Sequence, residues 1–202
     1  MQGSEIVRKG YNNIAGKYNK QRHLYPNKSL LLRFMKYIPK KARILDLGCG
    51  AAVPISRFLT QRGCEVTGID FSEEMLKIAR KNVSNSRFLK MDITKLIFRP
   101  NSFDGAVSFY AIIHVPRAKH SRIYRGLHKI LRNNAYILVN AGGHKKWEET
   151  TKDYMGVPMF WSFYSPNKTL SIIKNEGFAI VWNKILRLGG ETQFWVLAKN
   201  RK

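Results

Sequence analysis

Three aspartates stand at the ends of short apolar runs in a chain that has few acids. Asp46 closes the run ILD, Asp70 closes VTGID and Asp92 closes RFLKMD, at nearly equal intervals. The 202 residues include only 13 Asp and Glu. Three of these acids in equivalent positions therefore indicate a common function. If each run is a strand of an open α/β sheet, the three carboxylates lie beyond the carboxyl ends of the strands, where such sheets bind ligands. The spacing therefore predicts a site.

A glycine turn follows the first of these runs. Gly48 and Gly50 lie in the segment DLGCGAA, which leads from the run into a helical pattern. A turn of this kind lets backbone amides approach a ligand carboxylate or phosphate closely. Asp70 comes 22 residues after Gly48, where a carboxylate accepts both hydroxyls of an adenosine ribose. An NAD fingerprint would have glycine where this chain has Val53.

Alternating strands and helices must hold these residues in place. Strands are expected at 43–47, 66–70, 87–91, 103–110 and 136–140, with helices between Pro54 and Gly63, after Ser72 and over 117–132. A helix opening at Ser165-Pro166 and two strands over 178–188 and 192–199, joined by Gly189-Gly190, complete the chain. This order predicts an α/β fold with a Rossmann-like, doubly wound, mostly parallel seven-stranded sheet and an antiparallel C-terminal strand.

One domain is expected over residues 1–202, with a helical segment at 1–40 and the Rossmann-like core at 41–202. The core carries an aromatic insertion at 142–164 that has no clear period. Its longest apolar stretch, 106–115, is too short for a membrane span, and the first residues lack the apolar region of a signal peptide. We therefore expect a soluble, cytoplasmic protein, a monomer or a homodimer. Two cysteines and no zinc-like spacing argue against a metal site.

The charge raises the possibility of a nucleic-acid partner. The formal net charge is +23, and Lys and Arg are the residues that neutralise phosphate. The basic residues are spread evenly along the chain, however, and only Arg122, Arg125, Lys129 and Arg132 concentrate on one face of a predicted helix. Either that face is simply solvated or it meets an anionic partner.

Taken together, four ordered segments resemble the class I S-adenosylmethionine-dependent methyltransferases. ILDLGCGAA is similar to their first motif, VTGIDFSEEML to the second, FLKMDI to the third and FDGAVSFYAIIHV to the fourth. The resemblance covers nearly the whole chain and implies S-adenosylmethionine as the cofactor. One departure is Ala52, where the family commonly has a third glycine; we expect cofactor binding to be retained but weaker.

The resemblance also implies a role for each matching residue. Gly48, Cys49 and Gly50 would line the methionine moiety, with Asp46 nearby, and Asp70 would bind the ribose. Phe71 and Met75 would flank the adenine, and Asp92 and the Ile93 amide would bind its edge. Phe109 and Tyr110 would border the sulfonium and the acceptor. Simpler readings stay open for three of these residues: Cys49 as a small filler of the turn, Met75 as helix core and Asp92 as a loop cap.

Fewer residues of the sequence indicate where the methyl acceptor binds. His114 and Tyr110 are the candidate catalytic residues, and His114 is either a base or a histidine satisfied within its loop. Tyr11 and Tyr18 lie in a segment that looks like the family's lid helix, where such tyrosines close over the cofactor. Arg22 and His23 would then face the acceptor. The aromatic segment 142–164 would form the opposite wall, or pack over the sheet edge.

Three functions follow from these signals. The first is methyl transfer to a small-molecule acceptor, favoured by the lid-like amino terminus and the aromatic insertion. The second is methyl transfer to RNA or another anionic acceptor; the charge favours it, but the end of the fourth strand lacks the Asn-Pro-Pro-Tyr and Pro-Cys motifs of base methylation. The third is a cofactor-binding protein without activity, for which Ala52 is the only sign.

Overall fold

The computed structural model describes residues 3–21, 27–188 and 190–202 of the chain. Seven strands form one sheet in the order β3-β2-β1-β4-β5-β9-β8. The strands are β1 (Arg43–Leu47), β2 (Glu65–Asp70), β3 (Arg87–Lys90), β4 (Phe103–Ser108), β5 (Leu131–Asn140), β8 (Phe178–Leu188) and β9 (Glu191–Asn200). β1 to β5 pair in parallel, and β9 runs antiparallel to both of its neighbours. The predicted fold class is confirmed.

Helices cover both faces of this sheet and the carboxyl ends of its strands. They are α1 (Gly3–Gln21), α2 (Lys28–Met35), α3 (Ile55–Thr60), α4 (Glu73–Asn82), α5 (His120–Ile130) and α6 (Pro166–Asn175). α5 and α6 bury Ile123, Leu127 and Ile173 against one face. α2 and α3 bury Phe34 and Leu59 against the other. The two apolar clusters hold the strands in register, so the ends of the strands form a fixed platform.

α5 and β5 differ from the sequence prediction at their shared boundary. The helix begins at His120, after Pro116 and a 3₁₀ turn (Arg117–Lys119), and it ends at Ile130. β5 begins at once, at Leu131, and its first pair with β4 is separated from the rest by a register irregularity. Asn134 has a φ of 63° there. Because Arg132 to Asn134 are polar, the apolar periodicity of the sequence does not show that the strand starts this early.

The aromatic insertion contains a β-hairpin that the sequence reading missed. β6 (Trp147–Tyr154) and β7 (Val157–Phe163) form a separate two-stranded antiparallel sheet. β6 is mostly polar and exposed, whereas β7 is mostly apolar, with Met159 packed against α1 and Trp161 and Phe163 packed against the core. Neither strand therefore shows the alternation that identifies a half-buried strand.

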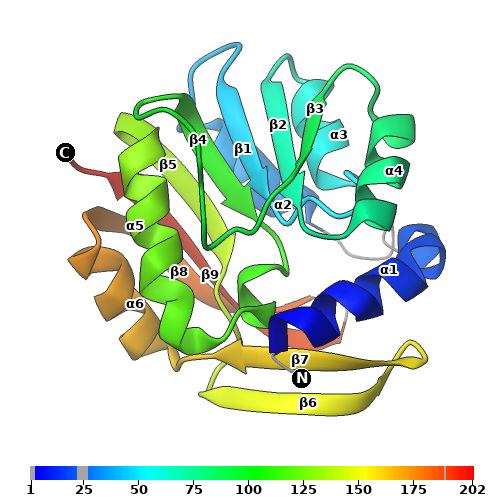
Figure 1. The fold of residues 1–202 in the computed structure, drawn as a ribbon. Coiled ribbons are helices and arrows are strands. Elements are labelled where there is room, and N and C mark those ends of the chain that lie inside the picture. Colours follow the sequence, from blue (N-terminus) through cyan, green and yellow to red (C-terminus); the bar gives the residue numbers. More distant parts are fainter. Residues whose placement is uncertain (1–2, 22–26, 189) are drawn as a thin grey trace.

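α1 lies across the carboxyl ends of the central strands, with β7 beneath it (Figure 1). The helix contacts β7 and α4, burying Val7 and Ile14 against Met159. The amino-terminal helix and the hairpin thus close the edge of the sheet at which the three aspartates stand.

Candidate functional site

A cavity lies at the carboxyl ends of β1, β2 and β4, beneath α1. Its volume is about 790 Å³, including the space at its mouth. Eleven of the thirteen residues predicted for the site line it: Tyr18, Gly48, Gly50, Asp70, Phe71, Met75, Asp92, Ile93, Phe109, Tyr110 and His114. The predicted site residues therefore converge on one cavity at this edge of the sheet.

Asp70 ends β2 with its carboxylate buried at the wall of this cavity. Oδ2 accepts the Gly50 N–H at 2.9 Å and Oδ1 accepts the Ser72 N–H at 2.9 Å. Burial raises the pKa of Asp70, and these backbone N–H groups oppose the increase. One carboxylate therefore joins the glycine turn to the start of α4, and each of its oxygens keeps a further lone pair for a ligand hydroxyl.

The glycine turn adopts the left-handed backbone that its sequence predicts. Gly48 has a φ of 67° and Gly50 a φ of 52°. A Cβ at Gly48 would overlap the Cβ of Ala111, so no other residue fits without a shift. Ala52 keeps the same left-handed conformation, with a φ of 65°, although it carries a side chain. Its methyl group is fully buried beside Leu76, which offsets part of the backbone strain.

Asp46 and Cys49 are the two predicted residues that do not line the cavity. Asp46 is 1% exposed and accepts a hydrogen bond from Ser56 Oγ at 2.7 Å, behind the turn. The Cys49 side chain is buried in an apolar cluster that includes Phe88. Burial raises its pKa well above the usual thiol range. This placement matches the simpler reading of Cys49 as a filler of the turn.

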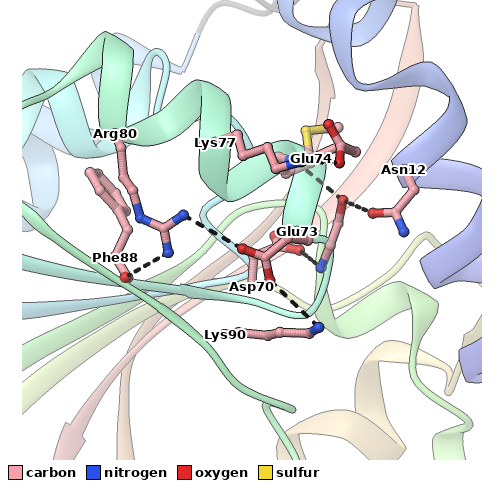
Figure 2. Close-up of polar contacts among 10 residues, drawn as sticks. Asn12, Asp70, Glu73, Glu74, Lys77, Arg80, Phe88 and Lys90 are labelled. Carbon is pink, nitrogen blue, oxygen red and sulfur yellow. Dashed lines mark hydrogen bonds and ion pairs between the residues drawn. The ribbon is translucent and has the colours of Figure 1, made fainter.

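A hydrogen-bond network ties the lid helix to the aspartate, as Figure 2 shows. Ser72 Oγ accepts the Met75 N–H, which caps α4, and donates to Asn12 Oδ1 of α1 at 2.7 Å. On the outer side of α4, Glu73 pairs with Arg80 and with Lys90 of β3. α1 is thereby anchored two residues away from the Asp70 carboxylate.

Asp92 follows β3 and caps its own loop. Its Oδ1 accepts both the backbone N–H and the hydroxyl of Thr94, each at 2.8 Å. These bonds fall on one oxygen and fix the carboxylate at the cavity wall beside Ile93. The loop-capping role and a role toward a ligand are therefore compatible.

His114 is buried between the lid and the hairpin. Its Nδ1 lies 2.8 Å from the Phe160 carbonyl oxygen and its Nε2 lies 2.8 Å from the Tyr11 hydroxyl. Since a carbonyl only accepts, Nδ1 carries the proton and Nε2 accepts from Tyr11. Burial lowers the pKa of His114 to about 4. At neutral pH this ring is a weak proton acceptor, so the geometry corresponds to a satisfied loop histidine rather than to a general base.

A second cavity adjoins the first on the hairpin side. It is lined by Tyr11, Tyr18, Tyr110, Ile113, His114, Tyr154, Trp161 and Glu191, four of which also line the first cavity. Aromatic residues of the insertion were expected here, but Glu191 was missed. It stands at the start of β9, far along the chain from every motif, and only the sheet topology brings it here. Arg22 and His23, also expected here, lie outside the described residues.

The sequence is similar to those of known methyltransferases. A family model described as a methyltransferase domain matches residues 44–134. A putative methyltransferase of Bacillus subtilis is 31% identical over 157 residues, which cover 72% of this chain and 63% of that protein. A demethylmenaquinone methyltransferase of Staphylococcus carnosus is 32% identical over 123 residues, or 55% of this chain and 51% of that protein. The chain thus spans less than two thirds of the length of these two relatives.

Solved structures share the fold. A methyltransferase of Methanosarcina mazei superposes with a TM-score of 0.74 at 20% identity, covering 84% of this chain and 97% of that one. Magnesium protoporphyrin IX methyltransferase of Synechocystis also gives a TM-score of 0.74, at 17% identity, covering 99% of this chain and 98% of that one. By its matched domain and its fold, the chain is similar to the class I S-adenosylmethionine-dependent methyltransferases. The cofactor of this family is S-adenosylmethionine.

The residues of the first cavity fit the cofactor of a class I methyltransferase. Asp70 offers a buried carboxylate, and Gly48 and Gly50 leave their side of the cavity free of side chains. Phe71 and Met75 supply apolar walls. Across the described ranges, no group of three or more His, Cys, Asp or Glu is arranged to hold a metal ion.

The basic face of α5 is partly neutralised by ion pairs. On α5, Arg125 forms two hydrogen bonds with the Glu176 carboxylate, both at 2.9 Å, and Arg132, just beyond the helix, pairs with Asp104. Arg122 and Lys129 form no ion pair within the part of the chain that the structure describes. None of the described helices is long and apolar enough to cross a bilayer.

Proposed function

We propose that this chain transfers a methyl group from S-adenosylmethionine to a small-molecule acceptor. One observation carries the proposal: two cavities of different character meet at a wall shared by Tyr11, Tyr18, Tyr110 and His114. The larger has the carboxylate and the glycine turn suited to an adenosyl cofactor, and the smaller is mainly aromatic. A transfer reaction needs two adjoining sites that hold the reactants in line and exclude water.

Each residue of the larger cavity then has a task in binding. Asp70 accepts the ribose hydroxyls, and the amides of the turn at Gly48 and Gly50 hold the methionine moiety. Phe71 and Met75 flank the adenine, Asp92 and the Ile93 amide bind its edge, and Phe109 and Tyr110 border the reacting centre. When bound, S-adenosylmethionine supplies the activated methyl group, so the protein has to contribute alignment more than acid–base chemistry.

His114 acts in this scheme as a positioning residue. Its Nδ1–H donates a hydrogen bond to the Phe160 carbonyl, and its Nε2 accepts a hydrogen bond from the Tyr11 hydroxyl. The Tyr11 oxygen is thereby oriented at the wall between the two cavities, while α1 stays closed over the site. Relatives named for demethylmenaquinone, sterol and magnesium protoporphyrin methylation support a small-molecule acceptor.

The test is transfer of a labelled methyl group into fractionated cell extract, preceded by calorimetry with S-adenosylhomocysteine. We expect the protein to bind the cofactor product and to place label in the small-molecule fraction. Label found only in RNA would refute the small-molecule acceptor. Binding without transfer into any fraction would instead favour the cofactor-binding protein without activity.

An anionic acceptor is the second candidate, and the net charge of +23 favours it. If RNA were the acceptor, its affinity would fall steeply with added salt, because binding releases counterions from the phosphates. The ion pairs of Arg125 and Arg132 leave the α5 face less basic than its sequence predicts. An RNA affinity that persists at physiological salt and drops after Arg122→Ala and Lys129→Ala together would support this candidate.

A further inference from the structure

The outer side of α2, together with the turn that follows it, is basic and carries no acid. We propose that this surface, the α2 face, docks on an anionic lipid bilayer, with Leu32 and Tyr37 entering the headgroup layer. The α2 face consists of the exposed residues Lys28, Ser29, Leu32, Arg33, Lys36, Tyr37, Pro39, Lys40 and Lys41. The inference goes beyond methyl transfer. It is carried by charge that the fold leaves unpaired and by apolar side chains that the core does not use.

The cations of the α2 face form no ion pair within the described part of the chain. They are Lys28, Arg33, Lys36, Lys40 and Lys41, and none of them is a member of any ion pair in the structure. Residues 27–45 contain no Asp or Glu, and neither do residues 1–2, 22–26 and 189, which lie outside the described ranges. The field of these cations is therefore not cancelled locally, and it attracts anions over about one Debye length.

The segment around α5 shows that a basic sequence alone does not produce such a surface. Residues 117–132 also contain no acid. Three arginines of that segment nevertheless pair with acids from elsewhere in the chain: Arg117 with Glu148, Arg125 with Glu176 and Arg132 with Asp104. Among the described residues, no acid reaches the cations of the α2 face in this way. The fold thus neutralises one basic helix and leaves the other charged.

Two large apolar side chains stand among these cations. Leu32 is 42% exposed and Tyr37 is 36% exposed. The buried side of α2 is formed by other residues, Leu30, Leu31 and Phe34. Leu32 lies four residues before Lys36 on the helix, so the two side chains are neighbours on its surface. Clusters of about four to eight Lys and Arg on a helix bind anionic lipid, and apolar side chains between them enter the boundary between headgroups and acyl chains.

A bilayer fits the α2 face better than the other common polyanion, a nucleic acid. Single-stranded nucleic acid is held by phosphate contacts and by stacking of bases on aromatic rings. The Trp182 ring of β8, next to α2, is covered by the Arg33 guanidinium, whose Cζ lies 4.6 Å from the ring centroid. Leu32 has no ring on which a base can stack. A lipid surface accepts both kinds of side chain, because aliphatic groups enter it while the cations stay at the headgroups.

The α2 face begins at the wall of the proposed active site. Asn27, the residue before α2, is 2% exposed and accepts a hydrogen bond from the Tyr110 hydroxyl at 3.3 Å. Tyr110 lines both cavities. Docking through α2 therefore holds the site next to the membrane, where an acceptor dissolved in lipid is concentrated. This consequence rests on the proposed methyltransferase function, whereas the docking itself does not.

The experiment is sedimentation of the full chain with lipid vesicles. Vesicles of phosphatidylcholine alone are compared with vesicles that contain about 30% phosphatidylglycerol, which supplies the negative surface potential. We expect the protein to bind the anionic vesicles at least about tenfold more tightly than the neutral ones, and added salt to weaken that binding.

Two double variants that remove the same charge test the location of the surface. Lys36→Gln with Lys40→Gln should weaken binding to the anionic vesicles by about tenfold. The matched control is Lys168→Gln with Lys174→Gln, two exposed lysines of α6, which covers the opposite face of the sheet; it should change the affinity by less than about twofold. Leu32→Ser should weaken binding by about threefold and leave the salt dependence unchanged.

Equal binding to neutral and anionic vesicles, or binding to neither, would overturn the proposal. An equal loss in the two double variants would show that net charge rather than the α2 face attracts the vesicles. If oligouridine RNA binds through Lys36 and Lys40 while Leu32→Ser leaves vesicle binding unchanged, the surface is an RNA site and the lipid assignment is wrong. Calorimetry with S-adenosylhomocysteine on the same samples separates the proposals, because failure to bind the cofactor product contradicts the methyltransferase function and leaves the vesicle result intact.

Discussion

At the scale of single residues, Asp70 is the group on which the larger cavity depends. Its two oxygens hold the glycine turn and the start of α4 through backbone N–H groups. A carboxylate that is buried and already bonded costs free energy to desolvate, and an incoming hydroxyl recovers part of that cost. Binding of the cofactor and the order of the turn are therefore linked through one side chain.

Asp70→Asn should lower the affinity for S-adenosylhomocysteine by at least about tenfold, since a hydrogen bond to a charged group contributes about 1.5–3 kcal/mol. Calorimetry measures the change directly. Glu74→Gln, on the exposed side of the adjoining helix, is the control and should bind normally. Unchanged affinity in Asp70→Asn would contradict the ribose assignment.

The sequence located this residue because its type, its place after an apolar run and its spacing from Gly48 all agree. It also placed Asp46 beside the methionine moiety, but the packing of α3 brings Ser56 to the Asp46 carboxylate and holds it behind the turn, a contact that the sequence does not show. Glu191 could not be predicted as a site residue from the sequence, for a different reason. No local pattern marks a residue whose neighbours in space come from α1, the segment after β4, and the hairpin strands β6 and β7.

At the scale of elements, the closure of the site depends on three segments that meet at one histidine. α1 contributes Tyr11, the 3₁₀ turn Ile112–His114 contributes the ring, and β7 contributes the Phe160 carbonyl. The repeating α/β units were predictable because strand and helix periods differ. The hairpin was not, because β6 is mostly polar and β7 mostly apolar, so neither strand shows a regular alternation of apolar and polar residues.

Tyr11→Phe removes the hydroxyl and leaves Nε2 of a buried histidine without its partner. We expect a loss of about 1–3 kcal/mol in the free energy of unfolding and a lower rate of methyl transfer, with S-adenosylhomocysteine affinity changed by less than about threefold. Chemical denaturation and steady-state kinetics measure these quantities. Tyr37→Phe, at an exposed position after α2, should leave all of them unchanged. A wild-type rate in Tyr11→Phe would contradict the positioning role of His114.

At the scale of the whole molecule, two buried histidines link stability to pH. Burial lowers the pKa values of His114 and His120 to about 4 each, from 6.5. The unfolded chain therefore binds more protons than the folded chain between about pH 6.5 and 4, so stability falls as the pH is lowered through that window.

Between pH 7 and pH 5, the free energy of unfolding should fall by about 2 kcal/mol for each of these histidines. Urea denaturation at the two pH values measures the decrease. His120→Gln should remove about half of it, because that variant keeps only His114 as a buried titrating ring. Equal stability at both pH values would show that neither histidine is neutralised by burial.

The hairpin β6–β7 pairs with no strand of the seven-stranded sheet. It contributes Tyr154 and Trp161 to the smaller cavity, the proposed acceptor side, whereas the residues proposed to bind the cofactor come from the main sheet, its loops, α1 and α4. The molecule is therefore modular: exchanging this hairpin for that of another class I methyltransferase would redirect acceptor choice while preserving the cofactor site. Engineering of a new acceptor specificity can begin with one contiguous insertion, provided that the carbonyl at position 160 still accepts the hydrogen bond from His114.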